Sequence, residues 1–332
     1  MARSADRRNP QQEGSRKAVF AAMGANLAIA VTKFGAALYT GSSSMLAEGI
    51  HSLIDTANEG FLLLGLHRAK KPANARHPFG YGVEIYFWSF VVAILIFALG
   101  AGFSIFEGVE TLLSEDGGSV QAPYVALAVL ALSFLFEGLS WRVAYREFNA
   151  RRAGNGLVRD LRDMKDPSVF VVLFEDSAAC IGIVIAALGI ALAWTTGIHA
   201  FDAIGSILIG VLLAATAAIL AVETKGLLIG EAASPEMEAL VRERVAELPE
   251  IVAVNELRTL HMGPNDVLLT MSVDFEDGVV SQRIEALVSE IETRLRRRFP
   301  LVRRVYIEVQ SRSGHAALAD GEDGSIAPIL TA

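Results

Sequence analysis

The first two thirds of the chain consist mainly of apolar runs that carry few charges. A helix needs roughly 20 apolar residues to cross about 30 Å of hydrocarbon. Six runs reach that length, and they stop near residue 222. We predict membrane-spanning helices over residues 18–39, 43–66, 85–113, 123–141, 168–194 and 203–222.

After residue 222 the pattern changes to short alternating runs and amphipathic helices. The sequence predicts helices over 235–247 and 279–298 and strands over 251–262, 267–275 and 302–310. Gly-Pro-Asn-Asp at 263–266 supplies a turn between the first two strands. The order α-β-β-α-β is typical of a ferredoxin-like α+β domain, with helices on one face of a three-stranded sheet.

Basic residues alternate between the two sides of the predicted spans. The first 17 residues, the loop 67–77 and the segment 142–165 carry Lys and Arg, whereas 114–122 and 195–202 carry neither. The positive-inside rule therefore places both ends in the cytoplasm. A polar start that leads directly into a full-length span indicates no cleavable signal peptide, so we expect an integral protein of a bacterial inner membrane.

These patterns divide the chain into four parts. We predict a cytoplasmic amino-terminal tail over 1–17, a six-helix transmembrane domain over 18–222 and a cytoplasmic ferredoxin-like domain over 223–310. Residues 311–332 are rich in Ser, Gly, Ala and Asp and are predicted to be a disordered tail. The fold class is thus an α-helical membrane protein with a carboxy-terminal α+β domain.

Composition excludes several classes of function. Hydrophobic residues make up 52% and charged residues 20%, less charge than the roughly 25% that is usual in soluble proteins. The 29 Lys and Arg against 37 Asp and Glu argue against a nucleic-acid partner, which needs a clustered basic surface. The single cysteine, Cys180, excludes a disulfide framework and a thiolate metal cluster. Any metal site must therefore use oxygen and nitrogen ligands.

Ionisable residues inside a span are costly and are functional candidates by default. His51 and Asp55 stand four residues apart, which places an imidazole and a carboxylate on one helical face. The pair can hold one divalent cation; alternatively, Asp55 only hydrogen-bonds His51. Glu48 lies near the same face, either as a partner of the pair or facing an outer vestibule.

The fifth predicted span carries two adjacent carboxylates, Glu175 and Asp176. Adjacent helical positions point about 100° apart, so both cannot aim equally at one point. At about 1.5 Å per residue, Asp176 lies roughly 14 Å from the cytoplasmic surface, at the level of His51 and Asp55. We therefore expect these groups to converge on one metal ion. Such ligands suit Zn²⁺ and also accept Mn²⁺, Fe²⁺ or Co²⁺.

We expect mainly structural roles for the other charged residues within or near the spans. Lys33 is expected to snorkel to the outer surface. Glu137 either pairs with Arg142 or lines the ion pathway. Solvation at the outer ends of their spans is expected for Glu107, Glu110 and Asp202.

Two motifs carry a family resemblance. Residues 41–55, Gly-Ser-Ser-Ser-Met-Leu-Ala-Glu-Gly-Ile-His-Ser-Leu-Ile-Asp, and 77–84, His-Pro-Phe-Gly-Tyr-Gly-Val-Glu, resemble the signature of the cation diffusion facilitators. Members of that family are six-span, proton-coupled exporters of zinc and related ions with a cytoplasmic ferredoxin-like domain. The resemblance covers about residues 15–310. Phe-Glu-Asp-Ser-Ala-Ala in the fifth span most resembles the branch with the mitochondrial zinc-transporter homologues and their bacterial relatives.

The resemblance implies a transport site on His51 and Asp55. The family's fifth span usually contributes a His or Asp followed four residues later by Asp; Asp176 fits the second place, but Val172 stands in the first. Either Glu175 replaces the missing ligand or the site is three-coordinate.

The resemblance also covers the loop and the soluble domain. The loop after the second span keeps His77, but Tyr81 replaces the family's second histidine, which argues against an accessory metal site there. The cytoplasmic domain offers His261 where some members use several histidines, so we expect it to bind little or no metal. Its expected role is to form a homodimer.

The resulting expectation is a proton-coupled antiporter, not an enzyme, that exports divalent metal cations, zinc first, by alternating access. Ligands must lose protons to bind metal, so protons and metal compete. The partners are divalent metal ions, protons, membrane lipid and a second copy of the chain, with no cofactor. Two alternatives that also involve a metal ion remain: an exporter selective for Mn, Fe or Co, and a membrane metalloenzyme. No His-Glu-x-x-His motif supports the metalloenzyme. A signalling or scaffold role lacks a phosphate loop, nucleophile elbow or kinase motif.

Overall fold

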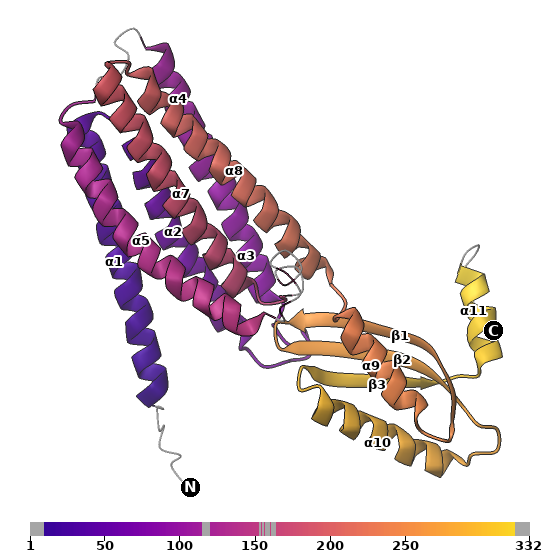
Figure 1. Ribbon diagram of the computed structural model, residues 1–332. Helices are drawn as coiled ribbons and strands as arrows, with labels where there is room; N and C mark the ends of the chain where they lie inside the picture. Colours follow the sequence, from indigo (N-terminus) through magenta and orange to yellow (C-terminus); the bar gives the residue numbers. More distant parts are fainter. Residues whose placement is uncertain are drawn as a thin grey trace. The chain divides into compact units, whose positions relative to one another are not determined.

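The computed structural model describes residues 10–114, 120–152, 154, 156, 160 and 164–322. The chain forms two compact units (Figure 1). The first comprises the chain up to Lys70 together with Glu84–Lys225, and the second comprises Lys71–Val83 and the chain from Gly226 onward. Each is described by itself.

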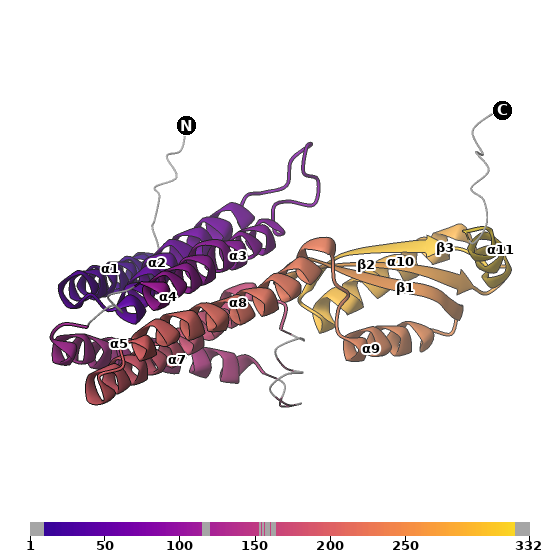
Figure 2. The same ribbon diagram turned by 90° about the horizontal axis from the view of Figure 1, so that it is seen from above.

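The first unit is built from long helices that run side by side (Figures 1 and 2). α2 packs against α1, α3, α4 and α7, and α5 packs against α1 and α7. The helices of this unit are α1 (Pro10–Thr40), α2 (Ser43–Ala69), α3 (Glu84–Leu95), the π-helical segment η1 (Ile96–Ala101), α4 (Gly102–Leu113), α5 (Pro123–Arg151), α7 (Pro167–Thr196) and α8 (Ala200–Ile229).

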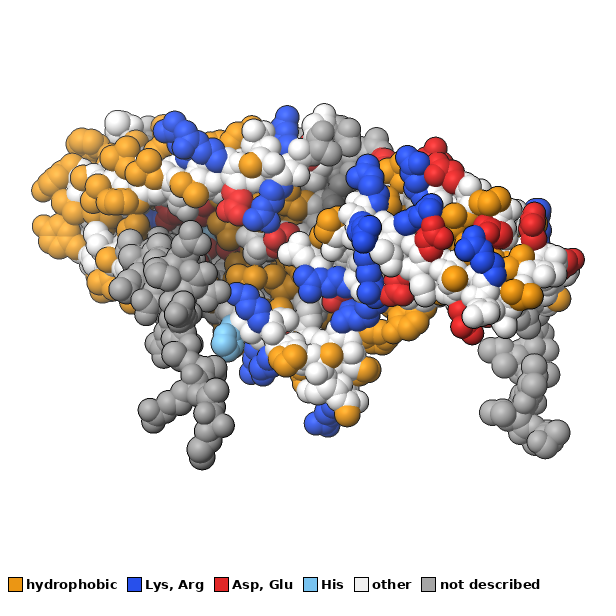
Figure 3. Space-filling view, turned by 90° about the horizontal axis from the view of Figure 1, so that it is seen from below, with side chains coloured by type: hydrophobic (Ala, Val, Ile, Leu, Met, Phe, Trp, Pro, Cys, Tyr) orange, Lys and Arg blue, Asp and Glu red, His pale blue; other side chains and the backbone are white. Residues whose placement is uncertain are grey.

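The helical unit is a transmembrane domain. Within the described residues, four helical stretches are long and apolar enough to cross a membrane: Glu84–Leu113, Pro123–Arg151, Pro167–Thr196 and Ala200–Ile229. On the face drawn in Figure 3, apolar side chains cover much of the helical unit, while charged side chains are frequent on the second unit. Exposed Leu38, Val143 and Val222 would face lipid. For α1 and α2, a membrane-spanning role stays a prediction.

Local sequence sets the ends of the site-bearing helices. The Ser42 side chain caps α2 by accepting from the Met45 backbone nitrogen at 3.1 Å. Pro167 opens α7 at a position where its missing N–H is not needed. Gly197 ends α7 with φ of 73°, a left-handed conformation that favours glycine.

The second unit contains the predicted α+β domain, in the order α9 (Pro235–Ala246), β1 (Ile251–Gly263), β2 (Asp266–Phe275), α10 (Ser281–Arg298) and β3 (Val302–Val309). β2 lies in the centre of the sheet, antiparallel to β1 and parallel to β3. Alternate β2 residues, among them Val267, Leu269 and Met271, join buried residues of α9 and α10 in one core. The predicted α+β class and element order are confirmed.

The structure differs from the predicted boundaries in three places. α1 begins at Pro10, inside the predicted tail 1–17. α11 (Arg312–Glu322) forms a helix where a disordered tail was predicted, and residues 323–332 lie outside the described residues. Residues 71–83 belong to the second unit because Arg304 of β3 donates to the Phe79 backbone oxygen at 2.9 Å and lies over the Phe79 ring.

Candidate cation site

Polar side chains form a row along one face of α2. Glu48, His51, Asp55, Asn58 and Glu59 are separated by steps of three or four residues, apart from the last adjacent pair. Such spacing keeps side chains on one side of a helix. Glu48, His51 and Asn58 are buried, and Asp55 and Glu59 are partly buried. We call these five residues the α2 polar row.

Each member of the α2 polar row has a buried side-chain atom without a hydrogen-bond partner among the described residues. These atoms are Glu48 Oε1, both ring nitrogens of His51, Asp55 Oδ1, Asn58 Oδ1 and Glu59 Oε2. Buried polar atoms are nearly always paired in proteins. A continuous row of unpaired oxygen and nitrogen atoms is therefore suited to a cation, which bonds lone pairs.

The alternative role of Asp55 as a simple hydrogen-bond acceptor for His51 does not fit the geometry. His51 Nδ1 lies 3.6 Å from Asp55 Oδ1, beyond the range of a hydrogen bond. A separation of this size leaves both atoms able to bind a third atom placed between or beside them. The His51–Asp55 pair is consequently available as a ligand pair.

The two carboxylates of α7 point to different neighbours. Asn58 Nδ2 donates to Glu175 Oε1 at 2.8 Å, so buried Glu175 faces α2. Ser140 Oγ donates to Asp176 Oδ2 at 2.8 Å, so Asp176 faces α5. The structure therefore brings Glu175, and not Asp176, into contact with the α2 polar row.

The four predicted ligands do not form one closed coordination sphere in this arrangement. Among the described residues, no three His, Cys, Asp or Glu side chains lie close enough together to hold a metal ion. The reason is rotational, since helix packing turns Asp176 towards Ser140 while Glu175 meets Asn58. His51 and Asp55 lie 3.6 Å apart on α2, and Glu175 contacts α2 through Asn58, three residues after Asp55.

Lys33 is fully buried, and the prediction that it snorkels to the surface is wrong. Its Nζ donates to Glu48 Oε2 at 3.0 Å and to Ser52 Oγ at 2.7 Å. Glu137 Oε1 of α5 lies 3.9 Å away, so Glu137 accompanies Lys33. Inside an apolar bundle these carboxylates provide the pairing that water would provide at the surface.

Asp202 is also fully buried, and the prediction that it is solvated is wrong. Its carboxylate, at the start of α8, accepts from Ser42 Oγ at 2.8 Å and from the Ser43 backbone nitrogen at 2.8 Å. The hydroxyls of Ser43 and Ser44 also donate to it. Because a helix amino terminus favours a negative charge, Asp202 fastens the start of α2 to α8.

Replacing Asp202 with alanine is expected to destabilise the helical unit by about 3 kcal/mol, because several charge-assisted hydrogen bonds to the start of α2 are lost together. Thermal unfolding of the purified full chain in detergent measures the effect. Glu110→Gln is the control, since Glu110 is an exposed carboxylate near the end of α4. Equal melting temperatures for Asp202→Ala and Glu110→Gln would contradict the proposed anchoring.

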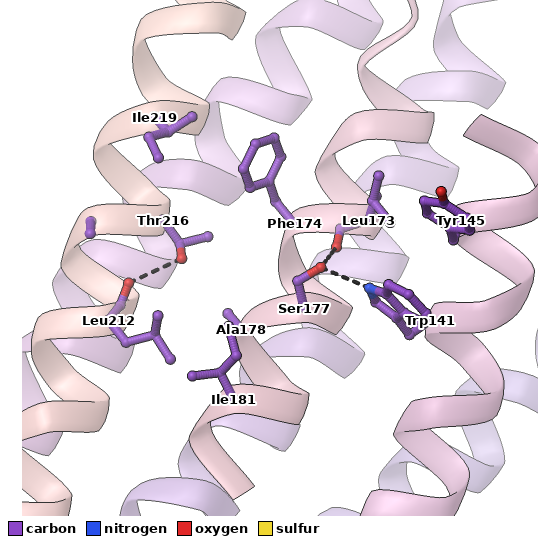
Figure 4. A pocket seen from close by; sticks show the side chains of 11 residues that line it. Trp141, Tyr145, Leu173, Phe174, Ser177, Ala178, Ile181, Leu212, Thr216 and Ile219 are labelled. Atoms are coloured by element: carbon purple, nitrogen blue, oxygen red, sulfur yellow. Dashed lines mark hydrogen bonds between the residues drawn. The ribbon is translucent and has the colours of Figure 1, made fainter. Parts of the chain in front are cut away.

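An apolar groove of about 360 Å³ lies along α7 and differs in character from the α2 polar row (Figure 4). Side chains of α5, α7 and α8 line it, including Trp141, Phe174 and Ile219. Several of its polar atoms are used internally: Ser177 Oγ accepts from Trp141 Nε1, and Thr216 donates to the Leu212 backbone oxygen. The groove thus suits hydrocarbon rather than a cation.

Two histidines singled out in the sequence, His77 and His261, lie in the second unit. His77 is exposed and stacks against Tyr81, with 4.4 Å between ring centroids. His261 is buried on β1, where its Nδ1 lies 3.5 Å from the Gly263 backbone oxygen. The structure does not place either of them with His51 in one unit.

Sequence reasoning missed two asparagines of the site. Asn58 contacts Glu175, and Asn26 of α1 donates to Glu59 Oε1 at 2.6 Å. The available signal for Asn58 was its spacing, three residues after Asp55 and seven after His51, which continues the same helical face. No comparable signal marked Asn26, whose partner lies 33 residues away.

Two family models match most of the chain. Residues 19–229 match the cation efflux transmembrane domain, and residues 233–311 match the cytoplasmic domain of cation efflux proteins. The chain belongs to the cation diffusion facilitator family. The family resemblance inferred from residues 41–55 and 77–84 is thereby confirmed.

Several named relatives are similar over most of this chain. The proton-coupled zinc antiporter SLC30A9, mitochondrial, of Homo sapiens is 34% identical over 272 residues, which are 81% of this chain and 48% of that protein. Metal tolerance protein C4 of Arabidopsis thaliana is 31% identical over 81% of this chain and 59% of its own length. The manganese efflux system protein MneP of Bacillus subtilis (strain 168) is 23% identical over 90% of this chain and 97% of its own length. The chain thus spans about half the length of the SLC30A9 protein.

Proposed function

We propose that this family member is a secondary transporter, not an enzyme, that exchanges divalent cations for protons across a membrane. The observation that carries the proposal is the α2 polar row, which holds unpaired oxygen and nitrogen atoms inside an apolar helical unit and contacts Glu175 through Asn58. Unpaired ionisable groups at such a place mark ion pathways. A metalloenzyme would also need a polar pocket for its substrate, and the groove of Figure 4 is lined mainly by apolar side chains.

The proposed ligands are His51, Asp55 and Glu175, with Asn58 Oδ1 as a neutral oxygen ligand. Asn58 and Glu175 already touch, and His51 and Asp55 lie 3.6 Å apart, so a rearrangement of α7 against α2 would be needed to close the sphere. An imidazole with two carboxylates suits Zn²⁺ in a tetrahedral site. We propose Zn²⁺ as the principal cargo and Mn²⁺ as an accepted one, because hard oxygen ligands also suit Mn²⁺.

We propose that the arrangement represents a state open to the cytoplasm. The partly exposed members of the α2 polar row are Asp55, with 15% of its side chain exposed, and Glu59, both nearer the Ala69 end; Glu48 and His51 are buried, as is Asn58 between the exposed pair. The positive-inside bias assigns the Ala69 end of α2 to the cytoplasmic side, so the exposed end is the cytoplasmic one. Cations would arrive from that side, and protons would displace them after the helices rearrange, since protonated ligands cannot hold metal.

We also propose that the α+β unit joins two copies of the chain into a homodimer. The support is its match to the cytoplasmic domain of cation efflux proteins, for which the family resemblance implies a dimerisation role. Light scattering of the purified full chain would give the mass of two chains. A monomer at all protein concentrations would refute the homodimer and leave the transport proposal intact.

Flux measurements test the transport proposal. The full chain, reconstituted in liposomes with an acidic lumen, is expected to take up Zn²⁺ several-fold faster than with equal pH on both sides, because outgoing protons drive exchange. A protonophore should remove the difference, and liposomes without protein give the leak. Uptake that is independent of the pH gradient would rule out proton exchange, and uptake equal to the leak would rule out transport.

A further inference from the structure

Four helices meet at the buried Lys33 cluster, which we define as Lys33, Glu48, Ser52 and Glu137. α1 contributes Lys33, α2 contributes Glu48 and Ser52, and α5 contributes Glu137. Gly182 of α7 lies against the carboxylate of Glu48. Side chains from three helices therefore form the cluster, and α7 covers the carboxylate of Glu48.

The charges of the Lys33 cluster do not balance. One ammonium stands between two carboxylates, bonded to Glu48 Oε2 at 3.0 Å and 3.9 Å from Glu137 Oε1. Glu48 is fully buried, and its second oxygen, Oε1, has no partner among the described residues. A buried ion is stable when it is paired with an opposite charge. The two carboxylates carry more negative charge than the one ammonium of Lys33 neutralises, and one oxygen of Glu48 is left without a partner among the described residues.

The spare oxygen of Glu48 packs directly against α7. A methyl group added at Gly182 would overlap Glu48 Oε1, so a larger residue there would displace the carboxylate. Two carboxylates that share one ammonium form a cation site, and the cation present in it is the ammonium of Lys33.

The cluster is the next position along the α2 polar row after the proposed central site. Glu48 precedes His51 by three residues, or about 4.5 Å along the helix axis, on the side away from the exposed end. Ser52, which holds Lys33, directly follows His51. An ion that leaves the central site away from the cytoplasm therefore meets Lys33 first.

We propose that Glu48 and Glu137 form a second cation station on the exit path, and that Lys33 is a tethered cation that occupies it in the inward-open state. This inference rests on the proposed transport function. Two cations at neighbouring sites repel each other. Lys33 accordingly limits the inward-open protein to one divalent ion, and its withdrawal frees two carboxylates to receive that ion during export.

Counting bound ions in matched variants of the full chain tests the proposal. Equilibrium dialysis in detergent with Zn²⁺ alone compares wild type with Lys33→Gln, which removes the charge, and Lys33→Arg, which keeps it. We expect Lys33→Gln to bind one Zn²⁺ per chain more than wild type, and Lys33→Arg to match wild type. The double variant Lys33→Gln/Glu48→Gln should lose the extra ion.

Two results would overturn the second station: a folded Lys33→Gln that binds no extra Zn²⁺, or an extra ion that survives Glu48→Gln. If Lys33→Gln fails to fold, Glu137→Gln is used in its place. In that variant the ammonium of Lys33 stays paired with the carboxylate of Glu48. Glu137→Gln is expected to lower the maximal rate of Zn²⁺ flux about tenfold with an unchanged KM, and an unchanged rate would overturn the station. Absence of Zn²⁺ binding by wild type would instead refute the proposed function itself.

Discussion

Replacing Asp55 with asparagine is expected to weaken Zn²⁺ binding by at least about 100-fold and to reduce pH-driven flux to the leak of empty liposomes. Asp55 supplies a charged oxygen, Oδ1, that is buried and unpaired, and a neutral amide is a much poorer ligand. Isothermal titration of the purified full chain with Zn²⁺ measures the loss. Glu147→Gln is the matched control, because Glu147 is an exposed carboxylate of α5 paired with Arg151.

Stability separates a ligand role from a structural role for Asp55. A structural carboxylate would destabilise the protein when it is neutralised, as we expect for Asp202. Asp55 Oδ1 is instead buried and unpaired, so Asp55→Asn removes an uncompensated buried carboxylate and should leave the melting temperature unchanged or raise it. A variant that binds Zn²⁺ like wild type, or that loses binding only because it unfolds, would contradict the assignment of Asp55 as a ligand.

The second large effect on Zn²⁺ binding is expected from the adjacent carboxylates of α7, Glu175 and Asp176. Glu175→Gln should weaken Zn²⁺ binding by at least about 100-fold, whereas Asp176→Asn should change it by less than about tenfold. The reason is orientation, since Glu175 meets Asn58 of α2 and Asp176 accepts from Ser140 of α5. An asparagine at position 176 can still accept from Ser140, so the fold is kept.

The two α7 variants control each other, because each neutralises one carboxylate at almost the same depth. Titration with Zn²⁺ under identical conditions gives the comparison. A larger loss in Asp176→Asn than in Glu175→Gln would show that Asp176 is the ligand, as the position of the family motif implies, and that the orientation of α7 differs in the binding state.

Local sequence patterns were sufficient to predict the α+β unit and the His51–Asp55 pair of the proposed cation site. Alternation of apolar residues and the turn residues at 263–266 gave the strands within one or two residues at each end. The spacing of His51 and Asp55 placed them together, because an α-helix fixes that relation regardless of its neighbours. Both results depend on interactions within a few residues of the chain.

The orientation of α7 could not be obtained in this way. Counting residues from the membrane surface gives the depth of Glu175 and Asp176, but their direction depends on which helices pack around α7. Ser140 lies 36 residues from Asp176, and Asn58 lies 117 residues from Glu175. Sequence reasoning therefore took Asp176 as a ligand and left the role of Glu175 open, whereas the structure turns Glu175 towards α2 and Asp176 towards α5.

Buried charges were misplaced for the same reason. Lys33 and Asp202 each sit where surface solvation was the simplest expectation, and both find partners from other helices. The partners of Asp202 lie about 160 residues earlier in the sequence. A single charged residue near the end of a span can therefore be buried in the helix bundle, where groups of another helix pair with it.

X-ray absorption spectroscopy of the Zn²⁺-loaded full chain tests the proposed cation site most directly. We predict one imidazole ligand with oxygen atoms in the other positions and no sulfur, and we predict that His51→Gln removes the imidazole signal. An imidazole signal that persists in His51→Gln, or a sulfur ligand from Cys180, would place the ion elsewhere and contradict the assignment of the α2 polar row as the cation site.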